Sequence, residues 1–224
     1  MRKLCLLIAL TGSLASYQCY ALTVDINRVP GYAEVPGGEF TVVLDSSDAG
    51  DPVYASIISH YDASTIVGGG FETFCLSSTT ELLGNPQNAT LTSSGVAAGT
   101  AWLYSQFVNQ TLAGYNYTPG AGRVTSAWAL QNAIWELQGT SVLDPTAAAY
   151  YYNLAVTSLG LANALALTGG YSVDALDLTV TGPNGGLEVS QPMLAFVPDG
   201  GATAMLLGLA ISGLFFVSRK IRLV

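Results

Sequence analysis

Residues 124–135 read VTSAWALQNAIW, and the spacing of their apolar side chains decides the fold class. Apolar residues recur every three or four positions, which is the period of one face of a helix. Gln131 lies in the middle of this face, three residues after Trp128 and four before Trp135. The stretch therefore predicts a helix that packs into the core with one carboxamide inside it. The apolar members of this face are Val124, Ala127, Trp128, Ile134 and Trp135.

Two more helices are expected on either side of this stretch. One follows Val96, because Trp102, Leu103, Phe107 and Val108 recur at helical spacing. The other is alanine-rich and is expected from about Pro145 to Leu167. Asp144 suits its N-cap, Pro145 suits its first turn, and Gly169 and Gly170 end it.

Short runs of β-branched and aromatic residues lie outside the helices, bounded by Gly, Pro, Asp and Ser, and they predict strands. The order of strands, helices and strands predicts an α+β domain, a β-sandwich or barrel with a helical insertion. The predicted strands cover residues 22–26, 40–44, 53–58, 71–76, 173–180 and 187–190.

The first 21 residues have the order of a secretory signal peptide: Arg2 and Lys3, an apolar run over residues 4–15, and a polar stretch that ends in small residues. Cleavage after Ala21 fits best, and cleavage after Ala15 is the alternative. An uncleaved membrane helix is disfavoured, because the apolar run is shorter than the roughly 20 residues that span a bilayer. We therefore expect an exported domain over residues 22–196.

Residues 197–224 combine three features in a fixed order. A motif comes first, an apolar stretch over residues 202–217 follows, and a basic tail ends the chain. The apolar stretch predicts a C-terminal transmembrane helix about 24 Å long, which is short for a hydrocarbon core of about 30 Å and suits a temporary anchor. Cations at its end would stay in the cytoplasm and leave the domain outside. The motif is Val197, Pro198, Asp199, Gly200 and Gly201, and the basic residues are Arg219, Lys220 and Arg222.

This order resembles the PEP-CTERM class of sorting signals in its VPDSG variant, with Gly200 where that variant has serine. The resemblance implies recognition by an exosortase, a membrane protease similar to transpeptidases. It also implies that the mature domain passes to the cell surface or extracellular matrix. The alternative is an ordinary C-terminal tail anchor, which would leave the domain on the same side of the membrane without processing.

Removing both ends leaves a strongly acidic domain. Residues 22–196 hold 14 acidic residues and two basic ones, Arg28 and Arg123, for a net charge of −12, and they contain no lysine. Such a surface repels a phosphate backbone, which disfavours nucleic acid as a partner. We expect no cofactor and no metal, because the sequence has no phosphate loop and no set of zinc ligands.

Cys75 is the one cysteine left when Cys5 and Cys19 depart with the signal peptide. In an oxidising compartment it has no internal disulfide partner. It is either a small buried hydrophobe or bonded through sulfur to something other than sulfur. Gln131 poses a matching question, because leaving a core carboxamide unpaired costs about 1 to 3 kcal/mol.

One reaction would answer both questions. The sulfur of Cys75 attacks the side-chain carbonyl of Gln131, ammonia leaves, and a thioester joins strand to helix. The alternative for Gln131 is ordinary hydrogen bonding to a backbone group.

Phe74-Cys75-Leu76 and residues 129–135, ALQNAIW, resemble the paired signature of bacterial thioester domains. The resemblance covers residues 71–139. It implies that Cys75 carries an acyl group donated by Gln131, that Trp128 and Trp135 shield the bond from water, and that a target amine opens it to leave a covalent amide. The absence of lysine fits this chemistry, because a stored amine-reactive bond is safer on a protein without amines.

Three alternatives rest on single features. Cys75 and His60 could form a nucleophile and base, but no other hydrolase signature surrounds either residue. Asp45, Asp48 and Asp51 could hold Ca²⁺, but their spacing is not that of an EF-hand loop, and a solvated acidic turn is favoured. The tyrosines at 150–152 are expected to pack, with glycan stacking as the alternative.

The sequence therefore predicts an exported surface or matrix protein that is not an enzyme and that attaches covalently to amine targets. Its expected partners are the membrane, an exosortase-type enzyme and an amine-bearing surface or matrix target. The alternative is a non-covalent structural or adhesive surface protein without a thioester.

Overall fold

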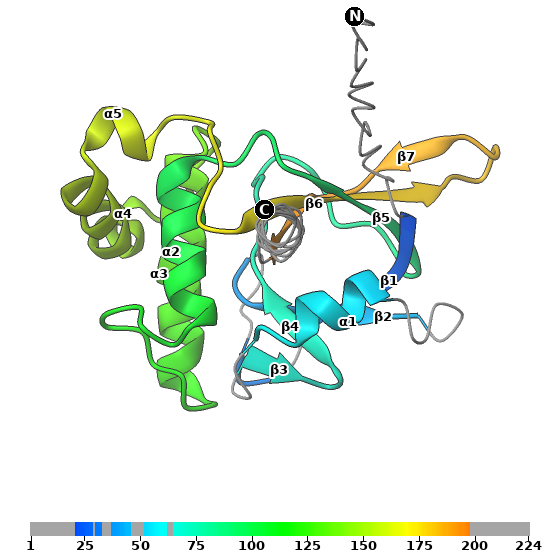
Figure 1. The fold of residues 1–224 in the computed structure, drawn as a ribbon, viewed down its shortest axis with the longest axis horizontal. Helices are drawn as coiled ribbons and strands as arrows, with labels where there is room; N and C mark the ends of the chain where they lie inside the picture. Colours follow the sequence, from blue (N-terminus) through cyan, green and yellow to red (C-terminus); the bar gives the residue numbers. More distant parts are fainter. Residues whose placement is uncertain (1–20, 29, 33–36, 46–51, 62–64, 198–224) are drawn as a thin grey trace, which may run out of the picture.

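The computed structural model describes residues 21–28, 30–32, 37–45, 52–61 and 65–197 (Figure 1). The strands are β1 (Ala21–Asn27), β2 (Phe40–Leu44), β3 (Ile66–Val67), β4 (Gly70–Thr73), β5 (Gln87–Thr92), β6 (Val173–Thr181), β7 (Leu187–Val189) and β8 (Met193–Phe196). The helices are α1 (Pro52–Ile58), α2 (Ala98–Val108), α3 (Ala121–Leu137), α4 (Pro145–Leu159) and α5 (Leu161–Ala164).

The strands form one antiparallel sheet in the order β3-β4-β2-β1-β5-β6-β7, and β8 pairs with the other end of β6. The sheet then closes, because β8 meets the chain just after β4. Cys75 pairs with Met193, Leu194 N–H donates to Phe74 O at 3.1 Å, and Leu76 N–H donates to Pro192 O at 2.9 Å. The result is a barrel, and Cys75 lies at the seam where β4 and β8 meet.

Alternation of side chains places one face of each long strand in the core. On β1 the buried residues are Leu22, Val24 and Ile26, at alternate positions. The predicted strands at 22–26, 40–44, 173–180 and 187–190 are confirmed by β1, β2, β6 and β7. The strand predicted at 71–76 is β4 followed by the isolated bridge at Cys75.

The helical insertion is confirmed as α2 to α5, between β5 and β6. In Figure 1, α2 and α3 stand beside the barrel, with α4 and α5 on their far side. Because α3 lies between the barrel and α4, it is buried on more than one face. The third predicted helix is interrupted at Gly160, whose φ of 81° suits glycine and ends α4 before α5 begins.

The strand predicted at 53–58 is wrong, because these residues form α1. Their β-branched and aromatic composition is typical of a strand. The spacing is helical, however: Tyr54, Ile57 and, past the helix end, Tyr61 are the buried positions. Pro52 also suits the first position of a helix.

Two barrel strands carry too little signal to predict. In β5, QNATLT, the buried residues Gln87 and Ala89 are a polar and a small side chain. β8 is only four residues long and directly follows Pro192. Both are strands because of the neighbours they pair with, which is a tertiary effect.

Candidate functional site

Cys75 is a free cysteine with 0% exposure at the barrel seam. Burial raises the pKa of its thiol well above the ordinary value, an effect that the positive charge of Arg28 partly offsets. The thiol is therefore protonated, and any reaction at the sulfur must give its proton to another group.

Gln131 projects from α3 onto the main chain of Cys75. Cys75 N–H donates to Gln131 Oε1 at 2.9 Å, and Gln131 Nε2 donates to Cys75 O at 2.7 Å. The carboxamide thus occupies the place of a neighbouring strand, since the register of Phe40 with Thr73 ends the pairing of β2 with β4 two residues earlier. The two residues singled out from the sequence are in direct contact, 56 positions apart in the chain. The covalent bond between them stays a prediction.

Trp135 and Gly37 close the site around the stem of Gln131. Trp135 is 1% exposed, and its Nε1 has no hydrogen-bond acceptor among the described residues. A Cβ placed on Gly37 would lie 2.7 Å from Trp135 Cη2 and 2.9 Å from Gln131 Cγ. Only a glycine therefore allows the chain before β2 to pack this closely.

Trp128 contacts Trp135, the other tryptophan of α3. Its ring packs edge-on against Trp135, with centroids 6.4 Å apart, and its Nε1 approaches Asp144 Oδ2 at 3.4 Å. Trp135 therefore packs at the Gln131 side chain and Trp128 packs on Trp135, while their shielding of a thioester stays a prediction.

A buried charged cluster lies beside this site and was missed by sequence reasoning. Arg123 Nε donates to Glu39 Oε2 at 2.9 Å, a second guanidinium nitrogen contacts Glu39 Oε1, and Tyr115 OH donates to Glu39 Oε2 at 2.9 Å. Thr41 Oγ1 lies 2.6 Å from Glu72 Oε1, to which it donates, while Glu72 Oε2 has no donor among the described residues. Glu39, Glu72 and Arg123 are all 0% exposed.

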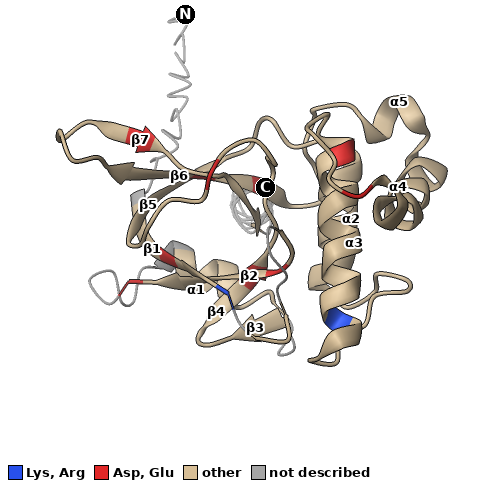
Figure 2. Ribbon diagram, turned by 180° about the vertical axis from the view of Figure 1, so that it is seen from behind, with Lys and Arg blue, Asp and Glu red and all other residues tan. Residues whose placement is uncertain are grey.

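Burial, followed by the negative charge of Glu39, raises the pKa of Glu72 to about 8. Burial raises the pKa of Glu39 as well, so the pair favours sharing a proton, and a proton on Glu72 gives it a hydroxyl that can donate to Glu39. One sequence signal could have pointed to this cluster: Arg123 is one of only two basic residues in the predicted domain. Among the charged residues of the described ribbon, acidic ones are far more common than basic ones (Figure 2).

The three alternatives gain little from the geometry. His60 is exposed after α1, where its Nδ1 contacts Ser56 O at 2.7 Å, whereas Cys75 is buried against Gln131. Within the part of the chain that the structure describes, no group of three His, Cys, Asp or Glu residues could hold a metal. Asp45 belongs to that part, while Asp48 and Asp51 lie outside it.

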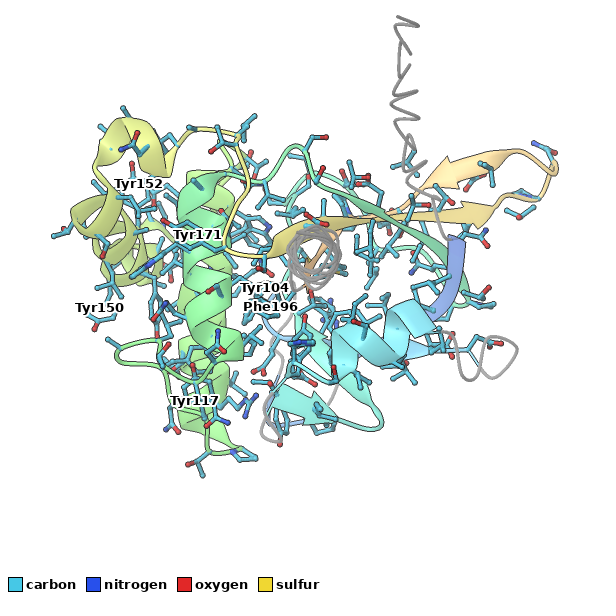
Figure 3. All side chains as sticks on the ribbon, in the orientation of Figure 1. Tyr104, Tyr117, Tyr150, Tyr152, Tyr171 and Phe196 are labelled. Carbon is cyan, nitrogen blue, oxygen red and sulfur yellow. The ribbon has the colours of Figure 1, made fainter. Side chains whose placement is uncertain are left out.

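Tyr150 and Tyr151, in the tyrosine run at 150–152, differ in exposure. Tyr151 is buried, and its ring lies 5.1 Å from that of Tyr150. Tyr150, on the helical side of the molecule in Figure 3, is 54% exposed. The packing prediction therefore holds for Tyr151.

The terminal signals lie almost wholly outside the described residues. Residues 1–20 and 198–224 are not described, so the signal peptide, most of the motif, the predicted membrane helix and the basic residues Arg219, Lys220 and Arg222 have no structural test. Over residues 21–197, gaps excepted, no helix is long and apolar enough to cross a membrane. Val197 is described, and its N–H donates to Ser172 O at 2.7 Å.

Comparison with known proteins identifies one segment. A family model described as the VPDSG-CTERM motif matches residues 197–221. No curated protein and no solved structure matches the chain.

This match supports the sorting signal predicted from the sequence. The C-terminal segment indicates a membrane-associated precursor, handled by an exosortase-type system and destined for the cell surface or exterior. The match begins at Val197, where the described barrel ends.

Proposed function

We propose that the barrel is an exported covalent attachment domain, in which Cys75 and Gln131 form an internal thioester. The observation that carries this proposal is that the Gln131 carboxamide contacts both main-chain groups of a cysteine, at 2.9 and 2.7 Å, where both residues are 0% exposed. That contact holds the carbonyl carbon of Gln131 beside the residue that bears the thiol.

The first step joins sulfur to carbon. Cys75 Sγ attacks Gln131 Cδ, the C–S bond forms, and the C–N bond breaks. The nitrogen leaves as ammonia with the thiol proton, so no other co-reactant is needed. Strand side chains stand roughly perpendicular to the sheet, whereas the peptide groups of a strand bond within it. We therefore expect Sγ to approach Cδ from outside the carboxamide plane, the direction from which a carbonyl carbon is attacked.

The main chain of Cys75 can assist this step in two ways. Its N–H already donates to Gln131 Oε1, and that hydrogen bond strengthens as the oxygen gains negative charge. Its carbonyl oxygen holds Gln131 Nε2, the nitrogen that leaves. Positioning of this kind raises the effective concentration of the two groups.

The second step transfers the acyl group to a target. An amine attacks Gln131 Cδ, an amide forms, the C–S bond breaks, and the sulfur regains a proton. Cys75 and Gln131 are both 0% exposed, which protects a thioester from water but also requires the site to open before an amine can enter. The target class is a primary amine on a surface or matrix component.

A second candidate function has an observation of its own. The Gln131 carboxamide is already satisfied at both ends by hydrogen bonds, so the geometry requires no reaction. In that case the barrel is a non-covalent structural or adhesive surface domain, and Gln131 serves to close the barrel seam.

Exposure of the exported chain to methylamine separates the two candidates. A thioester-containing chain takes up one methylamine at Gln131, found by peptide mass spectrometry, and releases a titratable thiol at Cys75. The matched variant Cys75→Ala takes up none. No uptake by the wild-type chain after unfolding in the presence of methylamine would reject the thioester.

A further inference from the structure

The buried charged cluster of Glu39, Glu72 and Arg123 ties together the segments that build the Cys75–Gln131 site. Glu72 is on β4, three residues before Cys75. Glu39 comes two residues after Gly37, which packs on Gln131 and Trp135. Arg123 is on α3, the helix that carries Gln131. A change of charge in the cluster therefore acts on all three segments of the site: β4, the segment before β2, and α3.

The cluster has one positive charge for two carboxyl groups. Arg123 donates to Glu39 through two nitrogens and to Tyr117 O through a third contact, and Glu39 accepts hydrogen bonds on both of its oxygens. The charge of Arg123 is thereby matched by Glu39. A second negative charge on Glu72 would be buried without a counterion, which is costly.

The unpaired oxygen of Glu72 is explained by a proton. Glu72 Oε1 accepts from Thr41, while Oε2 is buried and has no donor within the part of the chain that the structure describes. A carboxylic acid at Glu72 uses Oε2 as a donor to Glu39, so that both groups are satisfied. The other titratable groups near Glu72 are phenols that stay neutral: Tyr104, whose OH donates to Glu72 O at 2.8 Å, Tyr61, which contacts Tyr104, and Tyr115 on Glu39.

We propose that Glu72 is a positioning residue for the Cys75–Gln131 site, and that its proton, shared with Glu39, keeps the site closed. When Glu72 loses that proton, two carboxylates face each other beside one guanidinium, and repulsion separates β4 from the segment before β2. That movement withdraws Gly37 from Gln131 and opens the path that a target amine needs. The role of this opening, which is to admit an amine to a thioester, rests on the proposed function.

The direction of the pH effect follows from proton linkage. In the closed site the pKa of Glu72 is raised to about 8, whereas in an opened, hydrated site it returns toward its ordinary value of 4.5. Closure therefore binds a proton between these values, and opening becomes more favourable as pH rises from about 4.5 to about 8. Above that range both states are ionised and the effect levels off.

Hydrogen exchange of the exported chain, purified in detergent with its C-terminal segment, tests this proposal at a series of pH values. The exchange rate of the peptide that spans Cys75 is divided by the rate in Glu72→Gln at the same pH, which removes the intrinsic effect of pH. Glutamine keeps the shape of Glu72 and a donor for Glu39 but cannot ionise. We expect the ratio to rise by up to about tenfold per pH unit below about pH 8 and then to level off.

Two controls keep the result specific. Glu188→Gln, an exposed carboxyl on β7, should behave as wild type. A peptide from α4 that spans Tyr151 should exchange more slowly than the Cys75 peptide, because α4 does not open with the site. Should Glu72→Gln not fold, the rate at Cys75 in the wild-type chain divided by the intrinsic rate of the unstructured peptide at the same pH gives the same profile.

A ratio that stays flat over this range would overturn the proposal, and so would a Cys75 peptide that exchanges no faster than the α4 peptide, because both would then exchange only through global unfolding. Neither readout depends on a thioester. A chain of full mass that takes up no methylamine would reject the proposed function, whereas the exchange profile would still accept or reject the role of Glu72.

Discussion

Two side-chain carboxamides in this barrel form the same pair of hydrogen bonds with a strand residue. Asn85 accepts from Ile26 N–H at 2.8 Å and donates to Ile26 O at 3.0 Å. Gln131 accepts from Cys75 N–H at 2.9 Å and donates to Cys75 O at 2.7 Å. Paired bonding of this kind is therefore a structural device of the fold, and by itself it implies no chemistry.

The surroundings of the two carboxamides differ. Asn85 is exposed, whereas Gln131 is 0% exposed and lies beside Trp135 and Gly37. Ile26 offers no nucleophile, whereas Cys75 offers a thiol. Water exclusion and a nucleophile, added to a common hydrogen-bonding arrangement, are what distinguish the second pair and support its proposal as a reactive site.

Removing each carboxamide should give the largest difference between the pairs. In a Cys75→Ala background, where no thioester contributes, Gln131→Ala leaves a buried N–H and C=O unpaired next to a cavity. We expect a loss of roughly 3 to 5 kcal/mol in the free energy of unfolding. Asn85→Ala should cost about 1 kcal/mol, because water can replace its bonds. Urea denaturation measures both, and equal losses would show that burial does not separate the pairs.

Protonation of Glu72 should affect the Cys75–Gln131 pair and leave the Ile26–Asn85 pair unchanged. Native Glu72 retains a proton that the unfolded chain releases, so Glu72 stabilises the fold less as pH rises from about 4.5 to about 8. The difference in unfolding free energy between wild type and Glu72→Gln should change by up to about 1.4 kcal/mol per pH unit in this range. Urea titrations across pH measure it. A difference independent of pH would mean that Glu72 is ionised in the fold.

Adding a methyl group beside each pair should separate them again. Gly37→Ala brings a Cβ within 2.9 Å of Gln131 Cγ and should cost about 1 to 3 kcal/mol. Gly84→Ala, next to Asn85, meets no atom of the described residues within 4 Å and should change stability by less than about 0.5 kcal/mol. Thermal unfolding of both variants provides the measurement, and a neutral Gly37→Ala would contradict the close packing at the site.

Moving the thiol to the other pair should have no chemical effect. The double variant Ile26→Cys with Cys75→Ala places a thiol opposite Asn85, which is exposed to water. We expect its intact mass to equal that of the sequence. Loss of ammonia from this variant would show that any thiol facing a carboxamide reacts, and that the burial of Gln131 is not decisive.

Much of the site follows from the sequence because two of its features are local. The helical spacing around Gln131 places it on an apolar face, and Cys75 is the one cysteine of the domain predicted over residues 22–196. The same local patterns predict β1, β2 and α3 correctly. Where composition and spacing disagree, as in residues 53–58, composition misleads.

The remainder of the site depends on contacts between distant segments. Gly37 and Glu39 lie just before β2, without a periodic pattern that would direct them to α3. Their roles appear only when the barrel closes and brings β4, β2 and α3 together. The closing strand β8 was likewise not predictable, because its four residues are a strand only through their pairing with β6.

The intact mass of the exported wild-type chain tests the thioester most directly, measured beside Cys75→Ala. We predict that the wild-type chain is lighter than its processed sequence by one ammonia, that the variant has the full mass of its own sequence, and that no thiol is titratable in the unfolded wild type. A wild-type chain of full mass with one titratable thiol at Cys75 would contradict the thioester and leave Gln131 as a structural partner, as Asn85 is for Ile26.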